Sequence, residues 1–454
     1  MYMANPSLYE NMERNIYKIS ECEFSELRTQ NEPNIIWLMK YAATKYWDYG
    51  YNQKKKIHGM IKGQLAYFLY LYPHISNYVT QEFYEKIRDF TISQWNISEC
   101  NMQWYDIEGE DNNMFETQNV IGTEKGSYPP GWKIVPNLMM YEVCKRDSLE
   151  YQSYWDSAYS NCEWLINDVN LDLAANTKGQ RMSERVTLEA LSYFYKMYPQ
   201  QAPSGLVNKV ERCIDVFILR SDNLWDFRKV SSPNDTTVDA VNDVWALSSM
   251  NESGNVAGFP AVAYSCIMVN DNSSKNERLN EIALAHFDNV FGRNPLGIHY
   301  NYAATTEVKG ADKGCPDRQT GLGDLGWVVG CLDGSPKDNA YPYDPNAEIG
   351  YLEGWVAFNT AWNDSLAYFN NYYTTLEAVN NNDNTVTIRL KAPLNSTDGI
   401  DKGMVIVNGT ELDVTEVSTT SDVFEANYTI PYGTTKIIVK YGIGVFEKKL
   451  ELTL

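Results

Sequence analysis

The sequence predicts a large all-α domain followed by a small all-β domain. From about residue 34 to residue 372, apolar residues recur at spacings of three and four, which is the period of an amphipathic helix. After Tyr373, apolar residues alternate with polar ones, as in Val386, Ile388 and Leu390, which is the period of a strand. Helices followed by strands indicate two separate domains rather than one mixed sheet.

The helical pattern divides into about ten helices. They are expected near residues 34–48, 56–72, 80–95, 134–145, 151–166, 186–195, 206–218, 258–270, 279–290 and 350–370. The connections 99–133 and 293–349 are rich in Gly, Pro, Asn and Asp and are long for a compact domain. Loops of that length are usually functional.

The strand pattern predicts a small antiparallel domain at the C-terminus. Asn408-Gly409 is a hairpin signal, and it follows the apolar run from Met404 to Val407. We expect domains of residues 1–373 and 374–454, the second an immunoglobulin-like β-sandwich.

Composition and charge exclude several classes of function. A net charge of −21 argues against a nucleic-acid partner, because phosphate binding depends on clustered Lys and Arg. No run of about 20 apolar residues is present, so no membrane span is expected. The four histidines show no metal-ligand spacing, and His286 fits the buried face of its helix. The eight cysteines form no CxxC pair, and several are expected as buried free thiols. No cofactor is expected, and a structural calcium ion stays open.

Three motifs within residues 287–370 point to one family. The string from Gly292 to Gly297 reads Gly-Arg-Asn-Pro-Leu-Gly and follows directly on a helix, and Arg318 lies downstream. Asp344 is followed nine residues later by Glu353, and six residues after that come Asn359 and a threonine. These motifs resemble those of glycoside hydrolase family 9. The family's histidine two residues before the arginine is replaced here by proline, and two aromatic positions around the acidic motif hold Pro and Ile.

The resemblance implies both a fold and an activity. The fold is an (α/α)6 toroid, and the activity is inverting hydrolysis of a β-1,4-linked glucan or glucosamine-type chain, outside the cell or in the cell envelope. By resemblance, Glu353 is the general acid, Asp344 is a supporting carboxylate, and Arg318 with Asp317 belongs to a sugar-binding loop. The partner is therefore an oligosaccharide or polysaccharide.

Chemistry agrees with this assignment of the acid. Cleavage needs a carboxylic acid to protonate the leaving oxygen, and inversion needs a second carboxylate to activate water. Glu353 opens an apolar helix that contains Trp355 and Phe358. Partial loss of solvation there would raise the pKa of its carboxyl toward that of a useful acid. The alternative is a glutamate that only favours the helix dipole.

The family's N-terminal pair of aspartates, which holds and activates the attacking water, is absent as a string, and two places in the sequence are candidates for it. Helix order favours Asp48 in the place of the first aspartate, with Tyr51 replacing the second, which is the family's base. The string Trp104-Tyr105-Asp106 looks more like the family's motif, but it lies between later helices.

Aromatic residues in the long loops suggest a sugar-binding surface. Sugar rings stack on aromatic faces, and binding clefts are usually lined by such side chains. The candidates are Trp104, Trp132, Tyr300, Tyr302, Trp327 and Tyr343. The alternative is that these rings anchor their loops to the domain.

Two other functions remain open. One is a non-catalytic glycan-binding protein on the same scaffold, suggested by the missing aspartate pair. The other is a polysaccharide lyase, which would require a Tyr or His base near an Arg.

Overall fold

The computed structural model describes residues 3–4, 25–54, 57, 59–95, 131–169, 171, 183–229, 252–291, 293, 356–393, 402–418 and 422–454. The chain divides into two compact units. One is helical and comprises Met39–Ser365, and the other combines Met1–Leu38 with Leu366–Leu454. The domain boundary expected at residue 373 stays a prediction.

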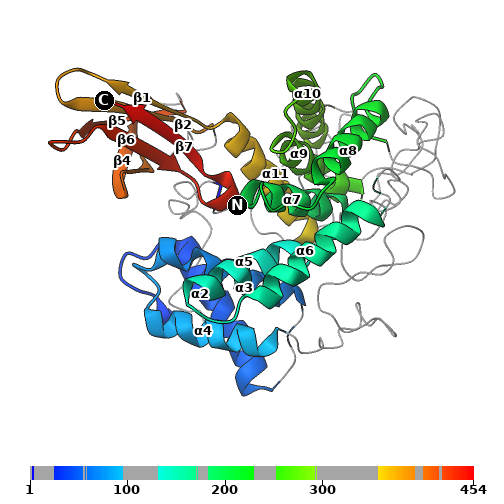
Figure 1. Cartoon of the computed structure of the whole chain (residues 1–454), viewed down its shortest axis with the longest axis horizontal. Helices are drawn as coiled ribbons and strands as arrows, with labels where there is room; N and C mark the ends of the chain where they lie inside the picture. The colour runs from blue at the N-terminus through cyan, green and yellow to red at the C-terminus, as the bar shows by residue number, and fades with distance from the viewer. Residues whose placement is uncertain are drawn as a thin grey trace, which may run out of the picture. The chain divides into compact units, whose positions relative to one another are not determined.

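All ten expected helices are present among the described residues (Figure 1). They are α2 (Asn34–Trp47), α3 (Gly59–Ile75), α4 (Gln81–Gln94), α5 (Ile134–Arg146), α6 (Gln152–Asn167), α7 (Ser183–Met197), α8 (Leu206–Arg220), α9 (Glu252–Ile267), α10 (Ser273–Val290) and α11 (Val356–Tyr373). A π-helical turn, η3 (Asp48–Asn52), continues α2 directly.

The helical unit has two kinds of helix, distinguished by their contacts. Helices α3, α5, α7 and α9 contact one another in succession, whereas α4 packs on α3, α6 on α5 and α10 on α9. Near the C-terminal ends of α5 and α3, Arg146 donates to the carbonyl of Leu69 at 3.2 Å. Near the C-terminal end of α7, the Tyr198 hydroxyl donates to Glu142 of α5. Helices α3, α5 and α7 therefore run in the same direction.

Buried polar side chains in this unit are held by specific partners. His286 is buried, and its Nδ1 lies 2.8 Å from the carbonyl of Ile282 while Nε2 accepts from the backbone N–H of Arg228 at 3.4 Å. Burial lowers the pKa of His286 to about 3, so the ring is neutral. The expected core histidine is confirmed. Four of the expected buried thiols are confirmed as well, namely Cys144, Cys162, Cys213 and Cys266.

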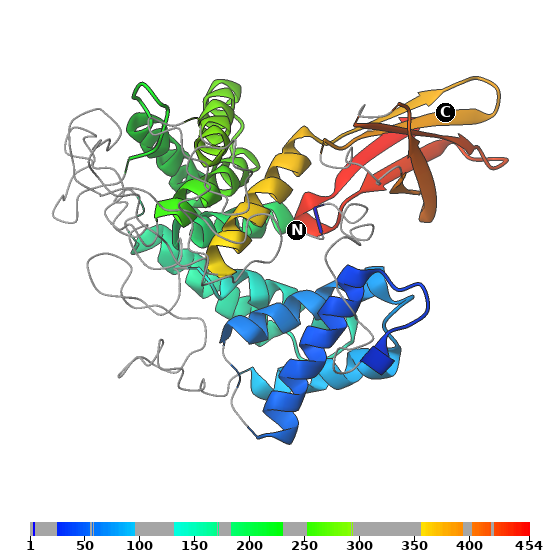
Figure 2. The ribbon, with the colours of Figure 1, turned by 180° about the vertical axis from the view of Figure 1, so that it is seen from behind.

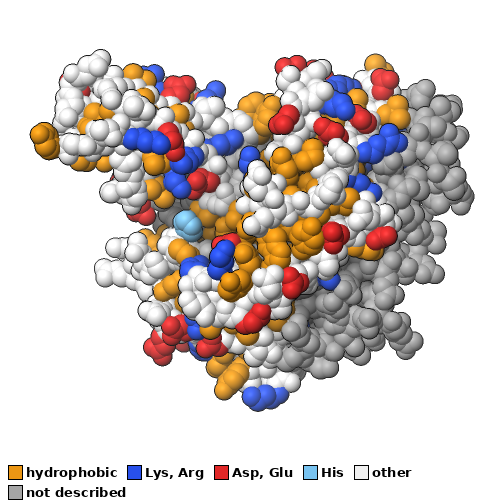
Figure 3. All heavy atoms as spheres, in the orientation of Figure 1, with side chains coloured by type: hydrophobic (Ala, Val, Ile, Leu, Met, Phe, Trp, Pro, Cys, Tyr) orange, Lys and Arg blue, Asp and Glu red, His pale blue; other side chains and the backbone are white. Residues whose placement is uncertain are grey.

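Aromatic rings gather where α5, α6 and α7 meet. Trp155 of α6 packs at 5.2 Å from Tyr141 of α5 and at 5.0 Å from Tyr198, the residue after α7, centroid to centroid. Figure 3 shows hydrophobic side chains collected over this part of the unit. Helix–helix packing here depends on large rings, which bury much area per residue.

The second unit contains a β domain of seven strands. They are β1 (Thr375–Asn380), β2 (Thr385–Lys391), β3 (Lys402–Val407), β4 (Thr410–Glu416), β5 (Val423–Thr429), β6 (Lys436–Tyr441) and β7 (Lys448–Thr453). All pairs are antiparallel, in the order β1-β2-β5-β4-β3-β6-β7. The terminal strands β1 and β7 also approach each other. The strands thus form one nearly closed barrel rather than the two stacked sheets of the expected sandwich.

Alternation along the strands fills the interior of this barrel. Val386, Ile388 and Leu390 of β2 are fully buried and pack with Phe424 of β5. The hairpin predicted at Asn408-Gly409 is confirmed: both residues have positive φ, +48° and +84°, and they join β3 to β4.

The last turns of α11 belong to the β unit. Asn371 donates to the carbonyl of Phe446 at 2.8 Å, and Tyr368 packs edge-on against the Phe446 ring. The C-terminal end of α11 is therefore fixed to the β domain. Among the described residues, no helix has the length and apolar character needed to cross a membrane.

Candidate functional site

Two of the site residues expected from sequence lie within the described part of the chain, Asp48 and Trp132. The remainder lie outside the described residues and stay predictions. They are Glu353, Asp344, Arg318, Asp317, Tyr300, Tyr302, Trp327, Tyr343, Trp104 and Asp106.

Asp48 begins the π-helical turn between α2 and α3. Its carboxylate accepts from the side-chain amides of Asn52 at 2.7 Å and Gln53 at 2.9 Å. These hydrogen bonds lower the pKa of Asp48, so the group is ionised at neutral pH. A general base must be in that state. The nearby Tyr51, 53% exposed, stacks on Trp47 with 4.9 Å between ring centroids.

Trp132 lies two residues before the start of α5 and is half-buried. Gly131 before it has a φ of +80°, and a Cβ at that position would lie 2.8 Å from Cδ1 of Leu165. Glycine is therefore required where the chain enters α5. The backbone next to Trp132 is therefore packed closely against α6.

The long connections lead into one class of helix. Residues 95–133 lead into α5, residues 168–182 into α7, residues 221–251 into α9 and residues 291–355 into α11, whereas the connections out of α3, α5, α7 and α9 are short. Every site residue expected from sequence lies in a connection that leads into α3, α5 or α11.

The structure also contains an ionic cluster that the sequence analysis did not identify. Arg185, in the first turn of α7, forms an ion pair with Asp364 of α11. The same guanidinium nitrogen, Nη1, lies 3.5 Å from Oε1 of Glu189, one turn further along α7. All three side chains are largely buried, with exposed fractions of 10% for Arg185, 18% for Glu189 and 20% for Asp364.

Burial favours the neutral form of one member of this cluster. It raises the pKa of Glu189 well above the usual range of a glutamate; Arg185 opposes that effect, and the charge of Asp364 adds to it. Tyr67 of α3 faces the same carboxylates: burial, then the charges of Glu189 and Asp364, raise the pKa of its phenol. The Tyr67 side chain is nevertheless 40% exposed, so the cluster has a neighbour in contact with solvent.

Next to Asp364, Ser365 links α11 to α9. Its Oγ donates to the carbonyl of Ala257 at 2.6 Å and accepts from the N–H of Ala261 at 3.2 Å. In an uninterrupted helix, these two backbone groups would bond each other. Pro260 lies between them inside α9, and a proline within a helix disturbs the hydrogen-bond ladder. The Ser365 hydroxyl therefore bridges the two groups at the proline.

Part of this cluster was detectable in the sequence. Arg185 and Glu189 are four residues apart on a helix and so share a face, which is a standard ion-pair spacing. The third residue of the cluster, Asp364, lies 179 residues from Arg185 in the sequence. Its contact with Arg185 is therefore visible only in the folded structure.

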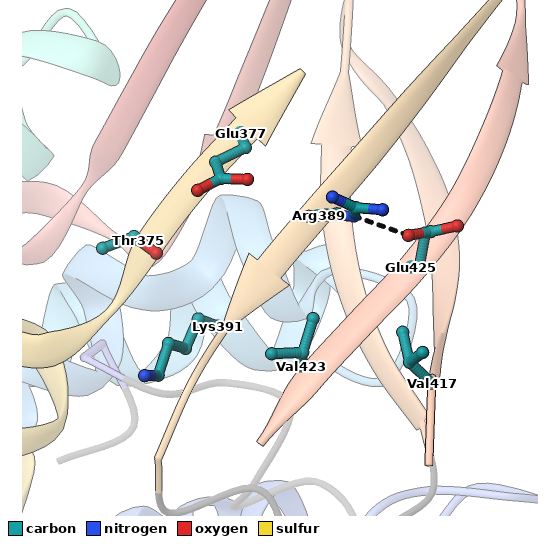
Figure 4. Close-up of a pocket in the computed structure, with 7 residues that line it drawn as sticks. All are labelled: Thr375, Glu377, Arg389, Lys391, Val417, Val423 and Glu425. Atoms are coloured by element: carbon teal, nitrogen blue, oxygen red, sulfur yellow. Dashed lines mark hydrogen bonds and ion pairs between the residues drawn. The ribbon is translucent and has the colours of Figure 1, made fainter. Parts of the chain in front are cut away.

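A hollow on the β domain is a weaker candidate. It lies on the face of β1, β2 and β5 (Figure 4), where Arg389 bonds Glu425 at 2.6 Å. Lys391 faces Asp422 at 3.9 Å. Arg389 and Glu425 already pair with each other, so these two charged groups offer little to a ligand. Among the described residues, no group of three or more His, Cys, Asp and Glu side chains is placed to hold a metal ion.

Comparison with known proteins gives a distant structural likeness only. No family model and no curated protein matches the sequence. The structure is similar to endoglucanase CelQ from Clostridium thermocellum complexed with cellotetraose, with a TM-score of 0.37 and 11% identity, over 87% of this chain and 69% of that one. Structures of the same endoglucanase with cellobiose and cellotriose, and with cellotriose, give the same values.

Proposed function

We propose that the protein is a glycoside hydrolase of the family 9 type, with an (α/α)6 toroid that cleaves a β-1,4-linked glucan or glucosamine-type chain. The observation that carries the proposal is the acidic motif ahead of α11, in which Asp344, Glu353 and Asn359 have the family's spacing. The Gly-Arg-Asn-Pro-Leu-Gly string supports it, because α10 ends at Val290, directly before that string. We propose action outside the cell or in the cell envelope.

In this proposal, hydrolysis uses two carboxyl groups. Glu353 gives its proton to the glycosidic oxygen as the bond from that oxygen to the anomeric carbon breaks. A water molecule attacks the anomeric carbon from the opposite face and loses a proton to a carboxylate base, which inverts the configuration. Asp48, in the place of the family's first aspartate, is proposed as the base because its carboxylate is ionised and only partly buried. Asp344 supports the acid, and Arg318, Asp317 and the loop aromatics bind the sugar.

Chromatography of cellotetraose digests tests the assignment. Wild-type protein should release shorter oligosaccharides, and Glu353→Gln should release none while still binding cellotetraose in a calorimetric titration. Removing a general base typically costs about 10² to 10⁴ in rate, so a loss of that size in either Asp48→Asn or Asp106→Asn identifies the base. Full activity in Glu353→Gln would refute the assignment of the acid.

Glycan binding without catalysis is a second candidate, and Tyr51 favours it. By helix order, this residue occupies the place of the second aspartate of the family's pair. Its ring stacks on Trp47, and the ammonium of Lys54 lies 4.4 Å from its centroid. A tyrosine in that place supplies no carboxylate base. Binding of cellotetraose with no product from the wild-type protein would establish this function. An unsaturated, ultraviolet-absorbing product end would indicate the lyase.

A further inference from the structure

We propose that Arg185 and Asp364 are positioning residues, which hold the N-terminal half of α11 against α7 and α9 and thereby set the place of Glu353. Glu353 precedes the first residue of α11 by three positions. The role of Glu353 rests on the proposed function, whereas the attachment of α11 rests on the contacts of the helical unit alone.

The attachment is concentrated in little more than one turn of α11. Ala361 lies against Gly258 of α9, Asp364 pairs with Arg185, and Ser365 bonds the α9 backbone. A Cβ on Gly258 would lie 3.2 Å from Cβ of Ala361 and 3.4 Å from Cδ of Arg185. The absence of a side chain at Gly258 therefore allows both α11 and the arginine to approach α9 closely. Figure 2 shows α11, in gold, passing in front of these helices.

Helix α10 holds the same turn of α11 from another direction. The ring of Trp362 packs edge-on against Phe287 and Phe291, with 5.4 Å between centroids in each case. These aromatic contacts are apolar and do not depend on pH. The Arg185–Asp364 pair is the charged contact of this turn of α11. Its strength depends on the charge of the neighbouring titratable groups.

Glu189 makes this charged contact sensitive to protonation. Among the described residues, the charged and titratable groups that act on its carboxyl are Arg185 on its own helix, Asp364 from α11 and Tyr67 from α3. While Glu189 is protonated, the charge of Arg185 is available to Asp364 alone. Once Glu189 is ionised, two carboxylates share one guanidinium in a poorly solvated place, and they also repel each other. The contact between α7 and α11 should therefore weaken at alkaline pH.

Hydrogen exchange of the α11 peptides tests this without any assay of activity. We would measure the amide opening of residues 356–366 at pH 6 and pH 9, corrected for the intrinsic exchange rate. Because Glu189 binds its proton more tightly in the folded state than in the open state, opening of α11 in the wild type should rise from pH 6 to pH 9. In Glu189→Gln, which cannot ionise, opening should be nearly constant.

Two further variants separate this mechanism from general destabilisation. Glu163→Gln removes a carboxyl group that is exposed on α6, and it should leave the pH response of α11 unchanged. Asp364→Asn should increase α11 opening at pH 6, because the ion pair is lost while Glu189 is still neutral. A wild-type α11 whose protection does not change between pH 6 and pH 9, or a Glu189→Gln variant that still responds, would overturn the proposal.

Kinetics on cellotetraose then test the effect on Glu353. Asp364→Asn should lower kcat by about tenfold or more with little change in KM, because a misplaced acid slows the chemical step rather than binding. Glu189→Gln should keep the kcat of the wild type at pH 6 and retain it to higher pH. A pH profile of Glu189→Gln identical to that of the wild type would refute the positioning role. If the wild type hydrolyses nothing but the exchange pattern holds, the proposed function fails and the attachment of α11 stands.

Discussion

Replacing Ser365 by alanine removes a single hydroxyl that serves two backbone groups. The side chain is fully buried, donating to the carbonyl of Ala257 and accepting from the N–H of Ala261. A buried backbone group left without a partner costs about 1–3 kcal/mol. The bond from Ala261 is the longer of the two, at 3.2 Å against 2.6 Å, so it should contribute less. We therefore expect Ser365→Ala to destabilise the helical unit by about 2–4 kcal/mol.

Urea unfolding followed by circular dichroism measures this loss, and Ser160→Ala is the matched control. Ser160 is exposed on α6, and its hydroxyl also bonds a backbone carbonyl, that of Ser157 at 3.2 Å. That substitution should stay within about 0.5 kcal/mol of the wild type. In Ser365→Ala, hydrogen exchange at the Ala261 amide should also increase. A Ser365→Ala protein as stable as Ser160→Ala would mean that α9 closes its own hydrogen bond past Pro260, and the reasoning would be wrong.

Other substitutions give separate tests. Asp147→Asn should lower stability, by about 1–3 kcal/mol, because Asp147 accepts from Tyr84 at 2.6 Å and from Arg88 at 2.7 Å. These bonds outweigh burial and lower the Asp147 pKa, so wild-type stability should fall in acid as the carboxylate is protonated, and melts in Asp147→Asn should lack that component. His286→Gln should flatten the loss of stability from pH 6.5 toward 3, because only the unfolded chain protonates His286 there. Phe424→Ala should cost about 3–5 kcal/mol in urea unfolding of the β domain.

Local pattern predicted the existence and type of the helices, but not all of their limits. Helix α9 was expected from residue 258, and it begins at Glu252. The earlier start means that Pro260 lies inside the helix, whereas a proline usually marks the start or the end of a helix. In the fold, the hydroxyl of Ser365 bridges the interrupted backbone groups, so α9 continues through the proline. The compensating residue lies on another helix, and sequence periodicity carries no information about it.

The β domain shows a similar limit. Alternation correctly placed Val386 and Leu390 on the inner face of the sheet, and the Asn408 turn was predicted from its dipeptide. Which strands pair, and whether β1 meets β7, depends on contacts far apart in the sequence. Alternation gives the faces of each strand but not its neighbours, and for that reason the sandwich was expected in place of one curled sheet.

In the candidate site, too, local properties follow from the sequence, whereas contacts between distant residues do not. The charge state of Asp48 follows from neighbours within five residues, Asn52 and Gln53, and is a local property. The pairing of Arg185 with Asp364 is not local, and no motif announces it. The acidic motif around Glu353 was recognised by its spacing, which carries information about the family but none about the distance between carboxyl groups.

Proton NMR of the first product of cellotetraose hydrolysis tests the central claim most directly, because the configuration of the new sugar end reports the chemistry. Wild-type protein should release the α-anomer first, which then equilibrates, and Glu353→Gln should release none. Release of the β-anomer, an unsaturated end group, or no product at all from the wild type would contradict the central claim.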